Sequence, residues 1–174
     1  MLGIAGRIGS GKSTLAEALA SRLGWAWGGF GSYVRSVATS KGLRQDREAL
    51  QELGQSLLAD DCEAFCSSVL RAAGWRAGRP LVIDGIRHSK IIRVLRSLVL
   101  PSALVLLYVE TPEEVLRDRR DRREPSARGH WQRLEGHSTE AEVAAGVRNA
   151  ADLLLDGSKP VDDLVDEVIG FLRT

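Results

Sequence analysis

Eight residues near the start of the chain have the types and the spacing needed to hold a polyphosphate. They are Gly6-Arg7-Ile8-Gly9-Ser10-Gly11-Lys12-Ser13, and they match the pattern G-x-x-x-x-G-K-[ST] at every fixed position. In such a loop the glycines let the backbone curl around an anion while its N–H groups point inward. The lysine ammonium reaches the terminal phosphates, and the serine hydroxyl binds Mg²⁺. The motif therefore predicts a nucleoside triphosphate site contacted by Gly6, Ile8, Gly9, Ser10, Gly11, Lys12, Ser13 and Thr14.

The segments on either side of this loop are those that the motif requires. Residues 1–5 are apolar and typical of a short buried strand, whereas residues 13–23 place leucines on one face of a helix. A strand, a loop and a helix in this order direct the helix N-terminus at a bound phosphate. The alternative, a chance turn rich in glycine and serine, does not account for these neighbours.

The rest of the chain alternates between apolar runs and amphipathic stretches. The runs at 25–30, 81–84, 103–109 and 152–155 are predicted strands, and the stretches between them have helical spacing. One long helical stripe begins at Asp46, with Gly54 as its expected break, and Thr111 is expected to cap the helix that follows it. Five strands alternating with helices predict a three-layer α/β fold of the P-loop NTPase type. Its five-stranded parallel sheet has helices on both faces, in a single domain spanning residues 1–174.

An acidic residue ends the apolar run at 81–84. Because the carboxyl ends of parallel strands share one edge of the sheet, Asp84 is expected beside the glycine-rich loop. A carboxylate there binds Mg²⁺, often through water, with the Ser13 hydroxyl as the other protein ligand. The alternative is an aspartate that only caps the next helix.

Arginine is concentrated in one stretch. Residues 117–133 hold seven arginines and three acidic residues, although the net charge of the whole chain is only +1. Arginines that close over a triphosphate neutralise its charge and exclude water, so residues 117–136 are predicted to form a short arginine-rich lid. A solvated helix with Arg–Asp pairs is the alternative, and it is expected to account for some of these arginines.

Composition excludes several other classes of protein. The two cysteines, Cys62 and Cys66, are one helical turn apart and are predicted to be buried free thiols. The absence of a predicted disulfide framework is typical of proteins of the reducing cytoplasm. The first strand leaves no room for a signal peptide, and no apolar run is long enough to span a membrane. Without an overall basic excess, nucleic acid is not an expected partner. The expectation is a cytoplasmic monomer or homodimer.

The order of these motifs resembles a known family. The loop is followed by Phe30-Gly31-Ser32-Tyr33-Val34-Arg35, then by Asp84-Gly85-Ile86-Arg87, then by the arginine-rich stretch. This order resembles the nucleoside monophosphate kinase-like group of P-loop kinases. The Asp-Gly-x-Arg form is most similar to its dephospho-CoA kinase-like and archaeal adenylate kinase-related branch, and to phage deoxynucleotide kinases.

The resemblance implies roles for individual residues. Arg35 and Arg87 would grip an anionic acceptor, with His88 beside them, and the acceptor pocket would lie within residues 31–75. Arg119 and Arg123 would contact the phosphates, with Arg120 as a further candidate. Ser158 and Pro160 would line the adenine, mainly through their backbone. Many relatives carry aspartate where this chain has Ser32, so the acceptor chemistry at that position differs from theirs.

Together these features predict a kinase that requires ATP and Mg²⁺. It would transfer the γ-phosphoryl group to a phosphorylated or anionic small molecule, such as a nucleoside monophosphate or a dephospho-CoA-like metabolite, using Lys12, Asp84, Arg119 and Arg123 as catalytic residues. Two alternatives remain open. One is a kinase that acts on nucleic-acid ends, and the other is a nucleotide-dependent switch or binding ATPase, which the absence of an N-K-x-D motif disfavours.

Overall fold

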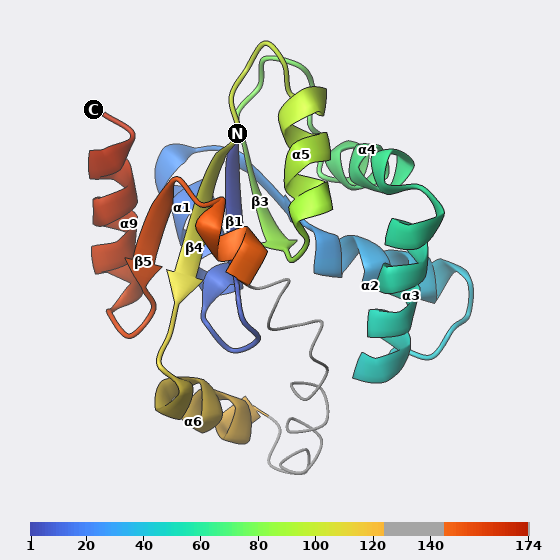
Figure 1. Ribbon diagram of the computed structural model, residues 1–174, viewed down its shortest axis with the longest axis horizontal. Helices are drawn as coiled ribbons and strands as arrows, with labels where there is room; N and C mark the ends of the chain where they lie inside the picture. Colours follow the sequence, from blue (N-terminus) through green and yellow to red (C-terminus); the bar gives the residue numbers. More distant parts are fainter. Residues whose placement is uncertain (124–144, 174) are drawn as a thin grey trace.

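Five parallel strands form the central layer of the computed structural model, which describes residues 1–123 and 145–173 (Figure 1). They are β1 (Leu2–Gly6), β2 (Ala26–Gly29), β3 (Leu81–Ile86), β4 (Val105–Glu110) and β5 (Leu153–Asp156). Their order in the sheet is β2-β3-β1-β4-β5, and every neighbouring pair is parallel. The predicted three-layer α/β fold with a five-stranded parallel sheet is confirmed.

Helices cover both faces of this sheet. On one face lie α1 (Lys12–Leu23) and α9 (Val161–Phe171), and on the other lie α2 (Phe30–Ser40), α4 (Cys62–Ala72), α5 (Ser89–Leu98) and a helical segment at 145–149. Side chains alternate between the faces along each strand, so that Leu2 and Ile4 of β1 pack under α1 and Ala5 packs under the other layer. The core is therefore divided into two apolar clusters by the sheet.

A further helix, α3 (Arg47–Asp60), packs against α2 and α4 without a fully buried residue of its own. The predicted break at Gly54 is wrong, because α3 runs through this glycine, which lies close to Val34 of α2. The break falls instead at Asp61, whose carboxylate accepts a hydrogen bond from the Ala64 N–H at 2.9 Å and thereby starts α4.

The strand order reverses direction at β1. The chain passes from β1 to β2 at one edge, returns to β3 beside β1, and then crosses to β4 and β5 on the other side, so the carboxyl end of β1 is the topological switch point. Helix α6 (Glu113–Arg123) follows β4 and lies beyond this edge, toward which the strand arrows point in Figure 1. A ligand site is expected at this edge. Within the described residues, no helix has both the length and the apolar character needed to cross a bilayer.

Candidate active site

Residues 6–13 form a tight loop, called here the phosphate loop, between β1 and α1. Gly6, Gly9 and Gly11 have φ angles of 149°, 85° and 90°, which side-chain-bearing residues rarely adopt. A Cβ on Gly6 would also lie only 2.7 Å from the Val109 carbonyl oxygen of β4. All three positions therefore require glycine for conformation, and Gly6 requires it for space as well.

The loop ends at the N-terminus of α1, where the helix presents free backbone N–H groups. Lys12 is the first residue of α1 and is only 9% exposed, and its Nζ donates to the Arg7 carbonyl oxygen at 3.1 Å. Ser13 and Thr14 follow it in the exposed first turn. The Ser10 hydroxyl is buried and has no hydrogen-bond partner among the described residues. A helix N-terminus with a lysine folded over the loop is well suited to bind an anion.

Two consecutive arginines of α6 contact the same loop. Arg119 donates from Nη1 to the Ser10 carbonyl oxygen at 3.3 Å, and Arg120 donates from Nε to the Ile8 carbonyl oxygen at 3.1 Å. Their surroundings differ, since Arg119 is partly exposed whereas Arg120 is only 4% exposed. Part of the arginine-rich stretch therefore lies directly on the phosphate loop.

Two other residues join α6 to the loop. Glu113 forms ion pairs with Arg7 of the loop and with Arg120, whose Nη1 lies 3.7 Å from the Glu113 Oε1. Thr111, which is expected to cap α6, donates from its hydroxyl to the Ser10 carbonyl oxygen at 3.3 Å. This contact is possible because Thr111 directly follows β4, beside the carboxyl end of β1.

Asp84 lies on the α1 face of β3. Val82 packs into the cluster under α1, and strand alternation places Asp84 on the same face, where it is 8% exposed. Gly85, with φ at 81°, then forms a bulge against β1, so that Ile86 returns to the opposite face. Asp84 and the N-terminus of α1 therefore share one face and one edge of the sheet.

The Asp84 carboxylate occupies space left by Gly29 of β2. An ideal Cβ on Gly29 would lie 1.9 Å from Asp84 Oδ1, although the Gly29 backbone is extended and open to any residue. The glycine is therefore required by the position of the carboxylate and not by its own conformation.

The residues expected to bind an acceptor lie on the opposite side of the sheet from α1. Arg35 follows the buried Val34 on α2, and Arg87 precedes α5; both arginines are exposed. His88 occupies the N-cap position of α5 without a side-chain cap, and its burial, with Arg87 beside it, lowers its pKa. The acceptor residues therefore lie on the face covered by α2 and α5, whereas the phosphate loop leads into α1 on the other face.

The predicted adenine loop lies next to Thr111. The Gly157 N–H donates to the Glu110 carbonyl oxygen at 2.6 Å, and a Cβ on Gly157 would lie 2.0 Å from the Thr111 hydroxyl. Ser158 donates from both its N–H and its hydroxyl to the Asp156 carboxylate, at 2.9 and 2.6 Å. Gly157, which precedes Ser158, thus lies against Thr111, whose hydroxyl contacts the phosphate loop, and Pro160 is exposed.

Several site contacts were not foreseen from the sequence. One is the ion pair between Glu113 and Arg120. Their seven-residue spacing places both on one face of α6, so the sequence contained a signal from which this pair could have been predicted. Another is the bidentate pair between Arg148 and Glu110, at 2.8 and 3.2 Å, which holds the pKa of Glu110 below its usual value. No local motif marks that pair, because its members are 38 positions apart.

The predicted lid is described only in part. Residues 117–123 belong to α6, whereas 124–136 lie outside the described residues, as does the side chain of Arg123. Within the described ranges, no group of three or more histidine, cysteine or acidic side chains is arranged to bind a metal ion.

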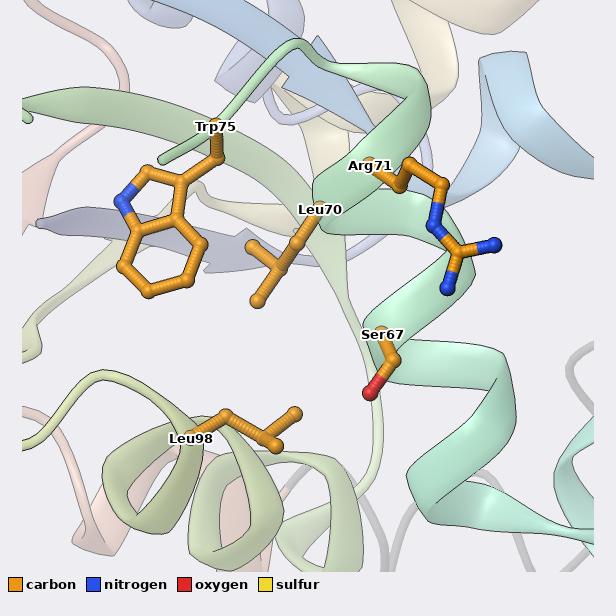
Figure 2. A pocket seen from close by; sticks show the side chains of 5 residues that line it. All are labelled: Ser67, Leu70, Arg71, Trp75 and Leu98. Carbon is orange, nitrogen blue, oxygen red and sulfur yellow. The ribbon is translucent and has the colours of Figure 1, made fainter. Parts of the chain in front are cut away.

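A pocket of ≈ 240 Å³ lies elsewhere, between α4 and α5 (Figure 2). It is lined by Ser67, Leu70, Arg71, Trp75 and Leu98. The Arg71 guanidinium points away from the Trp75 ring in this view. The lining residues lie near the C-terminal ends of the two helices, which precede β3 and β4, so this pocket is at the opposite edge of the sheet from the phosphate loop.

Solved structures with the same fold include several kinases. A shikimate kinase from Acinetobacter baumannii, solved in complex with shikimate, is 17% identical with a TM-score of 0.61, over 99% of this chain and 92% of that chain. A gluconokinase from Sinorhizobium meliloti 1021 is 18% identical with a TM-score of 0.57, over 99% and 90%. A sugar kinase from Janibacter sp. HTCC2649 is 20% identical with a TM-score of 0.56, over 99% and 93%. These likenesses show a shared fold.

The sequence itself matches one protein-family model, and no curated protein matches it. That model describes an AAA domain and covers residues 2–144, which include the phosphate loop, β3 with Asp84, and all of α6. The solved structures, at 20% and 17% identity, show the fold alone and do not distinguish the nucleoside monophosphate kinase-like branch that the motifs resemble. By the extent of this match, the chain belongs to the AAA domain family.

Proposed function

We propose that the protein is a small-molecule kinase that transfers the γ-phosphoryl group of ATP to an anionic acceptor. The observation that carries this proposal is the partly exposed Arg119 of α6, whose guanidinium lies at the phosphate loop and donates to the Ser10 carbonyl oxygen. A phosphoryl-transfer site needs cations beside the terminal phosphates, because negative charge develops there during transfer. A switch that only binds a nucleotide has no such need for an arginine beside its loop.

The donor side would be formed by residues that already lie together. Lys12 would exchange its bond with the Arg7 carbonyl for the terminal phosphates, and Arg119, which is partly exposed beside Gly11, would neutralise them from the side of α6. The Ser10 hydroxyl, buried and without a partner among the described residues, would gain an acceptor in a phosphate oxygen. Catalysis would then consist of positioning and charge neutralisation.

The residues on the α1 face also fit a magnesium ion. The Ser13 hydroxyl and the Asp84 carboxylate are hard oxygen donors, and Gly29 leaves the carboxylate the space it needs. When bound, Mg²⁺ would neutralise charge on the phosphate oxygens. A set of two protein donors is sufficient, because Mg²⁺ in such sites keeps water and phosphate ligands.

The acceptor would bind over α2 and α5, where Arg35 and Arg87 supply positive charge. Nucleoside monophosphates and dephospho-CoA-like metabolites remain candidates by motif. The kinases of shared fold act by name on sugars, gluconate and shikimate, and they add hydroxyl acceptors to the proposal. For a hydroxyl acceptor a base must remove the proton, and Asp84 is the candidate for that role.

A coupled ADP-release screen tests this proposal directly. The full chain is incubated with ATP, Mg²⁺ and one acceptor at a time, drawn from nucleoside monophosphates, dephospho-CoA, phosphorylated metabolites, sugars and sugar acids. We expect one class to stimulate ADP release well above the basal rate. If ATP binds and no acceptor stimulates release, the kinase assignment is refuted and a binding ATPase or switch takes its place.

Two variants separate the donor site from the acceptor site. Lys12→Ala is expected to abolish transfer while the protein stays folded, because it removes a charge and leaves the core unchanged. Arg87→Ala is expected mainly to raise KM for the acceptor, and Arg93→Ala, another exposed arginine near the start of α5, serves as its matched control. An unchanged acceptor KM in Arg87→Ala would show that this edge does not bind the acceptor.

A further inference from the structure

Arg119 and Arg120 are adjacent in sequence but stand in different relations to the phosphate loop. Arg119 is partly exposed, and its Nη1 lies 3.5 Å from where a Gly11 Cβ would be. Arg120 is 4% exposed, and its Cγ and Nε lie 3.3 and 3.5 Å from where a Gly9 Cβ would be. The first can reach a ligand in solvent, whereas the second is enclosed between α6 and the loop.

We propose that Arg120 is a positioning residue that orients the phosphate loop and does not itself touch the nucleotide. The proposal rests on the proposed function only in that the loop must bind a triphosphate. It assigns to Arg120 a role different from that of a lid arginine, although the two kinds of residue are neighbours on one helix.

The argument begins with the geometry of the peptide group. A peptide is planar and trans, so its N–H points opposite to its C=O. Because the Ile8 carbonyl oxygen accepts a hydrogen bond from Arg120 on α6, the Gly9 N–H of the same peptide group points away from α6. In the same way, the Ser10 carbonyl oxygen held by Arg119 and Thr111 fixes the direction of the Gly11 N–H. These N–H groups are the donors that such a loop offers to an anion.

Arginine suits this position because it can hold two groups at once. Its planar guanidinium has donors in a fixed arrangement, so Nε can bond the Ile8 carbonyl while Nη1 faces Glu113. Glu113 also pairs with Arg7, so the loop is connected to α6 at two of its residues. Lysine carries the same charge but a single donor group, and it can make only one of these contacts well.

The test measures binding of inorganic tripolyphosphate to the full chain by titration calorimetry, together with the melting temperature of the ligand-free protein. Arg120→Met is expected to weaken tripolyphosphate binding about 10- to 100-fold, the effect of losing one charge-assisted hydrogen bond to a group that must stay aligned. Arg120→Lys is expected to recover part of this loss. Arg122→Met is the matched control, because Arg122 is an exposed arginine of the same helix that pairs with Asp118.

A purely structural role would lower the melting temperature without changing the affinity of the folded protein, and that outcome would overturn the proposal. Equal affinity in Arg120→Met and wild type would also overturn it. If Arg120→Met does not fold, Arg120→Lys and Glu113→Gln decide the matter, since both must weaken tripolyphosphate binding at unchanged fold. A wild-type protein that binds tripolyphosphate but phosphorylates no acceptor refutes only the kinase assignment.

Discussion

Gly29→Ala is the substitution that tests the position of Asp84 most directly. The Gly29 backbone has φ −163° and ψ 155°, which alanine adopts without strain. The main obstacle is the Asp84 carboxylate, since the new Cβ would lie 1.9 Å from Oδ1, although contacts below 3.0 Å do not occur. The Asp84 carbonyl oxygen is farther away, at 3.3 Å. The carboxylate must therefore move by at least about 1 Å, and the backbone of β3 beside it leaves rotation of the side chain as the easiest route.

The expected cost in stability is about 1–3 kcal/mol, as for other overpacked core sites. The expected cost in activity is larger, because a displacement of about 1 Å at a reacting centre lowers turnover by about a hundredfold. Basal ATP hydrolysis, followed by ADP release across a Mg²⁺ titration, measures the second effect. Urea unfolding measures the first, and the activity loss should exceed what the unfolded fraction explains.

Two controls make this prediction refutable. Gly170→Ala on α9 introduces the same methyl group where, apart from the backbone of α9 itself, no atom of the described residues lies within 4 Å, and it should leave activity unchanged. In an Asp84→Ala background the obstacle is gone, so Gly29→Ala should then cost little stability. Wild-type hydrolysis and Mg²⁺ dependence in Gly29→Ala would show that Asp84 takes no part in the reaction.

Three further predictions follow from the same structure. Gly157→Ala should displace the Thr111 hydroxyl, weaken ATP binding and lower stability by about 1–3 kcal/mol in urea unfolding, because the new Cβ would lie 2.0 Å from that hydroxyl. Burial raises the pKa of the Cys66 thiol from 9.0 to about 12. Because the thiolate is the reactive form, Cys66 should react with iodoacetamide near pH 8 about a thousandfold more slowly in the folded protein than after unfolding. Equal rates would contradict its burial. The pKa of His88 is lowered from 6.5, so below that pH the unfolded chain binds more protons and stability should fall as the solution is acidified. His88→Gln should remove that part of the pH dependence, measured by urea unfolding between about pH 5 and 7.

The elements near the phosphate loop were predictable because their signals are local. Glycine at positive φ, a lysine at the first residue of a helix and an apolar strand before them all lie within a few consecutive residues. The periods of strands and helices differ, so the apolar runs can be told from the helical stripes. Strands that alternate with helices in this way predict a parallel sheet. Gly54 misled the prediction because a glycine in a helix interior costs only about 1 kcal/mol, which packing against Val34 offsets.

The orientation of Asp84 could not be predicted in the same way. An apolar run that ends in Asp-Gly does not reveal which face of the sheet the carboxylate occupies, because both faces of a parallel sheet are buried. The bulge at Gly85 changes the face of the sheet on which the following residues lie. In the sequence this glycine cannot be distinguished from one that simply ends a strand. The space at Gly29 is set by pairing with a strand more than 50 residues away along the chain (register Gly29 to Asp84).

The same reasoning explains why the arginine stretch could not be divided by sequence alone. A loop built around three glycines has little rigidity of its own, because glycine restricts its backbone least. Carbonyl oxygens at Arg7, Ile8 and Ser10 must therefore be held by other residues if the loop is to present its N–H groups before a ligand arrives. Some cations near such a loop are needed to fix it and others to meet the phosphates. Consecutive residues on α6 are about 100° apart, so they differ in burial, but the sequence does not show which face of α6 meets the loop. In the structure Arg120 is buried against the loop, whereas Arg119 is partly exposed.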